Sequence, residues 1–142
     1  EKLIRKAIEL DRRSRTEPPK PGQVLEHEPD NAAYLDSLGW VLFRRGQLRE
    51  AREWLEKAAA LPLGAEDPTV WDHLGDVCMR LNDSAGARAA WEKSRSLYAA
   101  ERRRRSDERY KDLQHKLELL DKEKRKCFRF SIFDCRLLGL TG

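Results

Sequence analysis

The stretch that decides the fold is LDSLGWVLFRRGQLREAREWLEKAAAL, residues 35–61, because its pattern returns 36 residues further along the chain. Three pairs of neighbouring residues are identical in the two copies: Leu38-Gly39 and Leu74-Gly75, Ala51-Arg52 and Ala87-Arg88, and Glu56-Lys57 and Glu92-Lys93. A sequence that matches itself at one fixed spacing is typical of an array in which one structural unit stacks on the next. We therefore expect two copies of one unit between residues 31 and 98.

Each copy predicts two helices joined by a short turn. In the first copy Leu35, Leu38 and Leu42 recur every three or four residues, which is the period of one helical face. Gly46 interrupts this stripe before a second stripe of the same period begins. In the second copy Asp67-Pro68 favours a helix start, because the aspartate can cap free amides and proline lacks the amide that would go unpaired. The spacing therefore predicts an antiparallel helix pair in each copy.

Two glycines lie inside the predicted helices, at Gly39 and Gly75. Glycine in a helix costs about 1 kcal/mol relative to alanine, so something must offset that loss. A close approach of the neighbouring helix would do so, because only a missing Cβ permits such a contact. We expect Ala51 and Ala87 to face the two glycines, with bulky side chains filling the adjoining space.

The pattern resembles the tetratricopeptide repeat, a helix–turn–helix unit of about 34 residues. The residues that carry the resemblance are Leu35, Leu38, Gly39, Leu42, Ala51, Leu55 and Ala58 in the first copy, and Trp71, Leu74, Gly75, Ala87 and Trp91 in the second. Leu42 and Cys78 stand where the family usually has tyrosine, and residues 31–40 are similar to repeats common in bacterial proteins. The resemblance implies an all-α fold: an antiparallel helix-pair solenoid of two full repeats, preceded by half a repeat and followed by a long charged helix.

The resemblance and the composition together predict a division of the chain into six segments. They are 1–13, the second helix of a truncated preceding repeat; 14–30, a proline-rich insertion; 31–64 and 65–98, the two full repeats; 99–126, a basic capping helix; and 127–142, a tail of poor order. The spacing of 36 residues implies two extra residues in each unit, which we place within 62–66.

The C-terminal part of the chain carries its excess of basic residues. Residues 101–126 account for the whole formal net charge of +4, and Arg102, Arg103, Arg104 and Arg105 form its densest run. The stripe Tyr110, Leu113, Leu117 and Leu120 fits a capping helix that covers the last repeat, or alternatively a short coiled coil. Residues 127–135 alternate partly like a strand, but an isolated strand has no partner.

No catalytic constellation emerges from the sequence, so we expect no enzyme activity, no cofactor and no metal site. His27 lies beside Pro29 and is interpreted as a solvated loop residue. His73 and Cys78 are five residues apart and would point to different sides of one helix, so they could not share a metal. Asp76 and Arg80 have the spacing of an ion pair on one helical face. No apolar run approaches the roughly 18 residues that a membrane-spanning helix needs.

A candidate partner-binding groove follows from the resemblance, because the first helices of such repeats line a concave surface. The residues placed there are Asp36, Trp40, Phe43, Arg44, Thr69, Asp72, Asp76, Met79 and Arg80. Trp40 and Phe43 lie off the leucine stripe, and aromatic residues flanked by charges are typical of binding hot spots. The alternative is that these two side chains pack against the preceding repeat.

The function that we expect is non-catalytic binding of a protein or peptide partner in this groove. Two alternatives stay open: the chain is an assembly or regulatory region of a larger protein, or the Arg102–Arg105 run binds an acidic partner, an anionic lipid or a nucleic acid. Three cysteines without a C-x-x-C pair suit a reducing compartment, which favours the cytoplasm, although export of a longer parent protein stays open.

Overall fold

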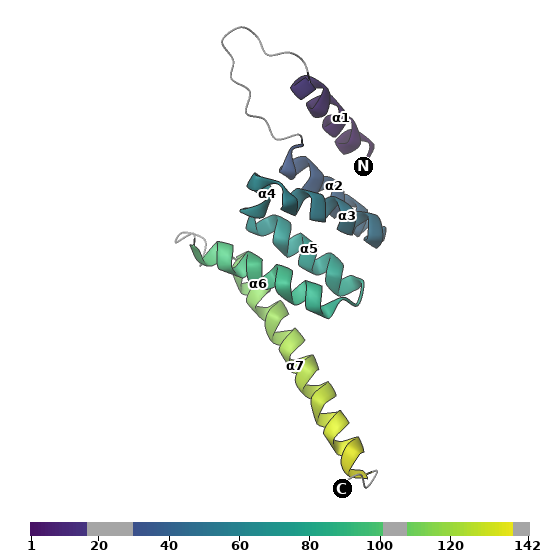
Figure 1. Ribbon diagram of the computed structural model, residues 1–142, viewed down its shortest axis with the longest axis vertical. Helices are drawn as coiled ribbons and strands as arrows, with labels where there is room; N and C mark the ends of the chain where they lie inside the picture. The colour runs from purple at the N-terminus through teal and green to yellow at the C-terminus, as the bar shows by residue number, and fades with distance from the viewer. Residues whose placement is uncertain (17–29, 101–107, 138–142) are drawn as a thin grey trace.

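The computed structural model describes residues 1–16, 30–100 and 108–137, and all regular structure within these ranges is helical. Seven helices lie in the described part of the chain: α1 (Lys2–Thr16), α2 (Ala32–Arg44), α3 (Leu48–Ala60), α4 (Pro62–Ala65), α5 (Pro68–Arg80), α6 (Ser84–Ala100) and α7 (Glu108–Leu137). Figure 1 shows them stacked in chain order from α1 at one end to α7 at the other. The predicted all-α fold is confirmed.

The two copies fold into matching helix pairs, α2 with α3 and α5 with α6. Asn31 caps α2 by accepting a hydrogen bond from the amide of Ala33 at 3.0 Å, and Asp67 caps α5 by accepting one from the amide of Thr69 at 2.8 Å. Helix α3 also packs on α5, which stacks the second pair on the first. The antiparallel helix-pair solenoid is therefore present as predicted.

The turns of the two pairs share one backbone feature at equivalent positions. Gly46 has a φ of 78°, and Asn82, which lies 36 residues later, has a φ of 62°. Glycine adopts this left-handed region freely, and asparagine tolerates it better than most other residues. The same turn geometry thus recurs in both copies, although the two turns share little sequence.

The extra residues of the 36-residue unit fall where α4 lies. This four-residue helix begins at Pro62 and connects the two pairs. Gly64 within it is buried, and a Cβ on this glycine would lie only 1.9 Å from the carbonyl oxygen of Ala58. The chain therefore needs a glycine at the point where α4 turns back against the end of α3.

Gly39 and Gly75 are the contact points that the sequence predicts. A Cβ on Gly39 would lie 2.6 Å from Cγ of Leu55, and a Cβ on Gly75 would lie 2.3 Å from Cδ1 of Trp91. A Cβ on Gly39 would also lie 3.2 Å from the carbonyl oxygen of Ala51, which faces this glycine as predicted, whereas at Gly75 the three nearest atoms all belong to Trp91 rather than to Ala87. Leu55 and Trp91 occupy equivalent positions of the two copies. In each helix pair, a bulky side chain of the second helix therefore packs on a glycine of the first.

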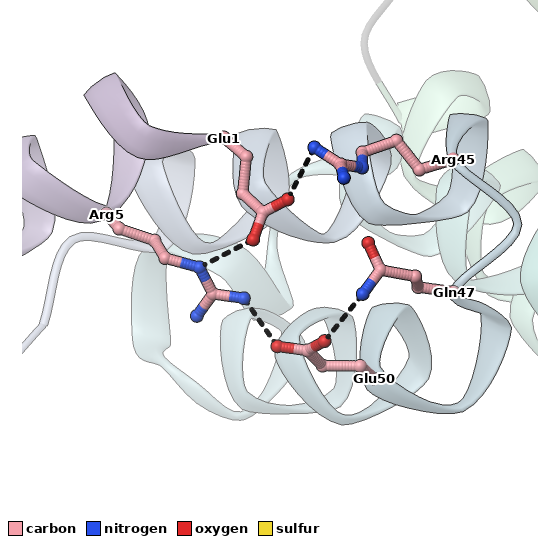
Figure 2. Close-up of polar contacts among 5 residues, drawn as sticks. All are labelled: Glu1, Arg5, Arg45, Gln47 and Glu50. Carbon is pink, nitrogen blue, oxygen red and sulfur yellow. Dashed lines mark hydrogen bonds and ion pairs between the residues drawn. The ribbon is translucent and has the colours of Figure 1, made fainter.

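Helix α1 lies across the end of the first pair and is joined to it largely by charged side chains. Glu1 forms an ion pair with Arg45 at 2.9 Å, and Arg5 forms one with Glu50 at 2.5 Å. Figure 2 shows both contacts. Ile8 is buried, whereas Leu3 is 86% exposed. The helix ends at Thr16, three residues beyond the predicted end at residue 13.

Helix α7 begins at Glu108 and packs on α6 through the predicted stripe, where Leu113, Leu117 and Leu120 are all buried. Helix α7 continues to Leu137, beyond the end at residue 126 that the sequence predicts for the capping helix. The physical reason is that no proline or glycine interrupts the chain before Gly139, and a lone strand-like alternation has no partner strand. Figure 1 shows this part of α7 running away from the helix pairs.

Among the described helices, none combines the length and the apolar character that crossing a bilayer requires.

Candidate binding face

Most of the predicted groove residues lie on one surface, which we call the first-helix face because it is formed by the first helices α2 and α5 and by α7. Two contacts join α2 to α5 across this face, and both link residues that are 37 positions apart. Nδ1 of His73 lies 2.8 Å from Oδ1 of Asp36, and the guanidinium of Arg80 lies over the ring of Phe43 at 5.7 Å from its centroid. Since a carboxylate only accepts hydrogen bonds, Nδ1 of His73 is the donor in the first contact.

Trp40 fills the space between these two contacts. Its ring stacks on Phe43 at a centroid distance of 4.9 Å and on His73 at 4.1 Å, with interplanar angles of 24° and 17°. Arg80, Phe43, Trp40 and His73 therefore form one continuous row, which we call the aromatic stack. Because Phe43 and Trp40 come from α2 and the other two residues come from α5, the stack fixes the two first helices against each other.

The aromatic stack corrects one of the two expectations for Trp40 and Phe43. The sequence predicts that, if they are not binding residues, they pack against the preceding repeat. The structure instead places their ring contacts on His73 and Arg80 of the following repeat. Both aromatic side chains remain partly exposed, so the face retains accessible aromatic surface.

The acidic residues of α5 are held by a lysine from α7. Nζ of Lys116 lies 2.9 Å from Oδ1 of Asp72 and 2.8 Å from Oδ1 of Asp76, and Nε1 of Trp91 donates to Asp76 at 3.2 Å. The predicted ion pair between Asp76 and Arg80 is not present, because Asp76 is paired with Lys116 instead. The contact of Arg80 is with Phe43 instead.

The electrostatics of this cluster follow from its burial. Burial raises the pKa of Asp76, although the hydrogen bond from Lys116 acts to lower it. Burial acts to lower the pKa of Lys116, but the contacts with Asp76 and Asp72 outweigh it and leave the pKa above its ordinary value. Lys116 therefore stays charged on α7 and neutralises carboxylates that would otherwise be costly to bury.

The other predicted site residues have simpler environments. The amide of Thr69 donates to the capping aspartate of α5, and Met79 packs against the hydrophobic core. Arg44 is exposed in the last turn of α2. His73 and Lys116 belong to the face and were not predicted there. The spacing of four residues from Thr69 and of three residues to Asp76 could have placed His73, whereas no local pattern identifies Lys116.

Other predictions concern residues beyond this face. Arg102, Arg103, Arg104, Arg105 and His27 lie outside the residues that the structure describes, so binding of acidic partners or nucleic acid by the arginine run stays a prediction. Within 1–14, 30–100 and 108–123, where the structure describes the side chains, no cluster of three His, Cys, Asp or Glu residues is arranged to hold a metal ion. Cys78 is buried, and burial raises the pKa of its thiol.

The comparisons with known proteins agree with this architecture. Residues 32–57, which span α2 and most of α3, match the tetratricopeptide repeat family. Among solved structures, PcrH in complex with the chaperone binding region of PopD is similar to this chain, with 21% sequence identity and a TM-score of 0.59. The alignment covers 66% of this chain and 68% of that chain. No curated protein matches the sequence. The chain therefore has a helical-repeat fold similar to that of PcrH, and residues 32–57 match one tetratricopeptide repeat.

Proposed function

We propose that this chain is a non-catalytic binding scaffold that holds a peptide or a segment of a partner protein on the first-helix face. The observation that carries the proposal is the aromatic stack, in which two partly exposed aromatic side chains are held in fixed positions by contacts from a second helix. Because these rings are already ordered, a partner would lose little additional freedom on the protein side when it binds.

The chemistry of the face supports this function. Tryptophan and arginine are enriched among the residues that contribute most to binding energy, and the stack combines both with a phenylalanine. The similar structure of PcrH holds a region of PopD, which supports a peptide-like segment as the kind of partner. A rigid array of helices that presents such a row suits recognition of an extended or helical segment.

A displayed library of random peptides tests the proposal and does not require the identity of the partner. Peptides are selected on the wild-type protein and then measured against Trp40→Ala and against Trp54→Ala. Trp54 is the matched control, because this half-buried tryptophan of α3 contacts Arg5 and Lys57 rather than the first-helix face.

We expect Trp40→Ala to weaken binding of the selected peptides by at least tenfold, whereas Trp54→Ala leaves it within a factor of about two. Circular dichroism of both variants checks that the helices persist. Selection of no peptides, or peptides that bind Trp40→Ala as well as wild type, would show that this face is not the binding site.

A further inference from the structure

The charges of the first-helix face are not all available to a partner. Helices α2 and α5 contribute three aspartates to it, and each is paired within the protein: Asp36 with His73 at 2.8 Å, and Asp72 and Asp76 with Lys116 at 2.9 and 2.8 Å. Asp112 of α7, whose side chain is 61% exposed, also lies 3.2 Å from Lys116. The side chains of the three aspartates are only 15–21% exposed. The acidic residues of this face therefore serve internal contacts, and a basic partner would have to displace Lys116 or His73 to reach them.

The arginines that α2 and α5 contribute to the face, unlike the three aspartates, have no ion-pair partner among the described residues. Arg44 and Arg80 end the two first helices at equivalent positions, 36 residues apart, and both are exposed. In the described part of the chain, neither guanidinium has a carboxylate within ion-pair distance. The contact of Arg80 is with the ring of Phe43. An arginine over an aromatic ring can still offer its N–H groups to a carboxylate.

The two arginines adjoin the exposed aromatic surface. Arg44 lies four residues after Trp40 in α2, which is the spacing of one helical face, and Arg80 lies over the ring of Phe43. A ligand that satisfies them needs negative charge next to an apolar or aromatic group. This combination of exposed cations and aromatic surface, beside acids that are already neutralised, selects one class of partner.

We infer that the partner segment is an acidic peptide, whose carboxylates bind Arg44 and Arg80 and whose neighbouring apolar or aromatic side chain lies on Trp40 and Phe43. This inference rests on the proposed function and adds the chemistry of the ligand. The alternative role of the two arginines is purely structural, because cations in the last turn of a helix offset the negative end of its dipole. The two roles predict different results in one experiment.

The experiment measures fluorescence anisotropy of synthetic labelled peptides on the full chain. The first peptide alternates glutamate with phenylalanine, the second replaces each glutamate with glutamine, and the third replaces each glutamate with lysine. We expect the acidic peptide to bind at least tenfold more tightly than the glutamine peptide, because charge-assisted hydrogen bonds are about twice as strong as neutral ones. Its affinity should fall as salt is raised, because these charges are exposed.

Variants then assign the binding to the two arginines. Arg44→Gln and Arg80→Gln should each weaken the acidic peptide by about tenfold, a loss of about 1.4 kcal/mol. Arg95→Gln is the matched control, since Arg95 is an exposed arginine of α6. The double charge reversal Arg44→Glu with Arg80→Glu should move the preference to the lysine peptide.

The outcomes separate this inference from the proposed function. One outcome is that binding of the library peptides requires Trp40 but the peptides are neutral or basic, or bind Arg44→Gln and Arg80→Gln as well as wild type. In that case the inference of an acidic ligand is wrong, whereas the proposed binding face is still supported. If the arginine variants lower only the melting temperature, the arginines are structural and the inference is overturned. If no peptide of any charge depends on Trp40, the binding face itself is wrong.

Discussion

Replacing Gly75 by alanine is the sharpest test of how the helix pairs pack. The new Cβ would lie 2.3 Å from Cδ1 and 2.4 Å from Nε1 of Trp91, closer than real carbon atoms approach. The ring cannot move freely, because Trp91 is 4% exposed and its Nε1 donates to Asp76. Relief of the clash therefore means displacing a buried indole together with its hydrogen bond.

The expected magnitude follows from three opposing contributions. Overpacking of a filled core costs about 1–3 kcal/mol. Weakening the bond from Trp91 to a carboxylate costs about another 1 kcal/mol, at the low end because the donor–acceptor distance is 3.2 Å. Alanine in place of glycine returns about 1 kcal/mol of helix propensity. We expect a net loss of about 2 kcal/mol in the free energy of unfolding.

Urea denaturation followed by far-UV circular dichroism measures this loss for Gly75→Ala in two backgrounds. In the otherwise wild-type protein, Gly75→Ala should lower the urea concentration at the midpoint of unfolding. In the Trp91→Ala background no large side chain lies against the new Cβ, so the same substitution should be neutral or should stabilise by up to about 1 kcal/mol. If Gly75→Ala stabilises the protein equally in both backgrounds, the glycine is not a contact point and the reasoning fails.

Three further predictions concern the ends and turns of the array. Lys116→Met should lower the free energy of unfolding by about 2 kcal/mol, because it leaves two partly buried carboxylates without their cation; an unchanged urea midpoint would contradict this. The hydrogen bond from Arg5 holds the pKa of Glu50 below its ordinary value of 4.5, so the attachment of α1 should persist from neutral pH down to that value and weaken as the pH falls through the lowered pKa. Amide hydrogen exchange in α1 measures this, and loss of protection near neutral pH would refute the ion-pair account. Asn82→Ala should destabilise by about 1 kcal/mol because Asn82 has a positive φ, whereas Asn82→Gly should be neutral or better; equal melting temperatures for both variants would exclude backbone strain at this turn.

The helix pairs and their contact points were predictable because they depend on short-range patterns. The leucine stripes fix which side of each helix is buried, and a glycine inside a helix signals a close neighbour whatever the rest of the fold does. Which residue contacts each glycine was harder to predict from the sequence. The sequence placed alanines opposite Gly39 and Gly75. Ala51 does face Gly39 through its carbonyl oxygen, but the nearest atoms belong to Leu55 at Gly39 and to Trp91 at Gly75.

The polar side of the binding face was predictable only in part. Spacing on one helix suggested that Asp76 would pair with Arg80, but an exposed pair of this kind is worth only a few tenths of a kcal/mol. A partly buried lysine from another helix easily outweighs it. The position of Lys116 depends on where α7 begins and how it lies against α5, and local sequence does not encode that arrangement. The continuation of α7 through 127–137 follows from the absence of any helix breaker there.

Because α7 is long, a small change in its tilt would move its C-terminal end by a large distance. Its 30 residues form a rod of about 45 Å, and the leucines of residues 108–123 that anchor it to α6 are Leu113, Leu117 and Leu120. A tilt of about ten degrees at that anchor would sweep the distal end through roughly 4 Å, because about 25 Å of rod extends past Leu120. A slight adjustment where Lys116 meets α5 would thus be magnified at a point remote from the repeats.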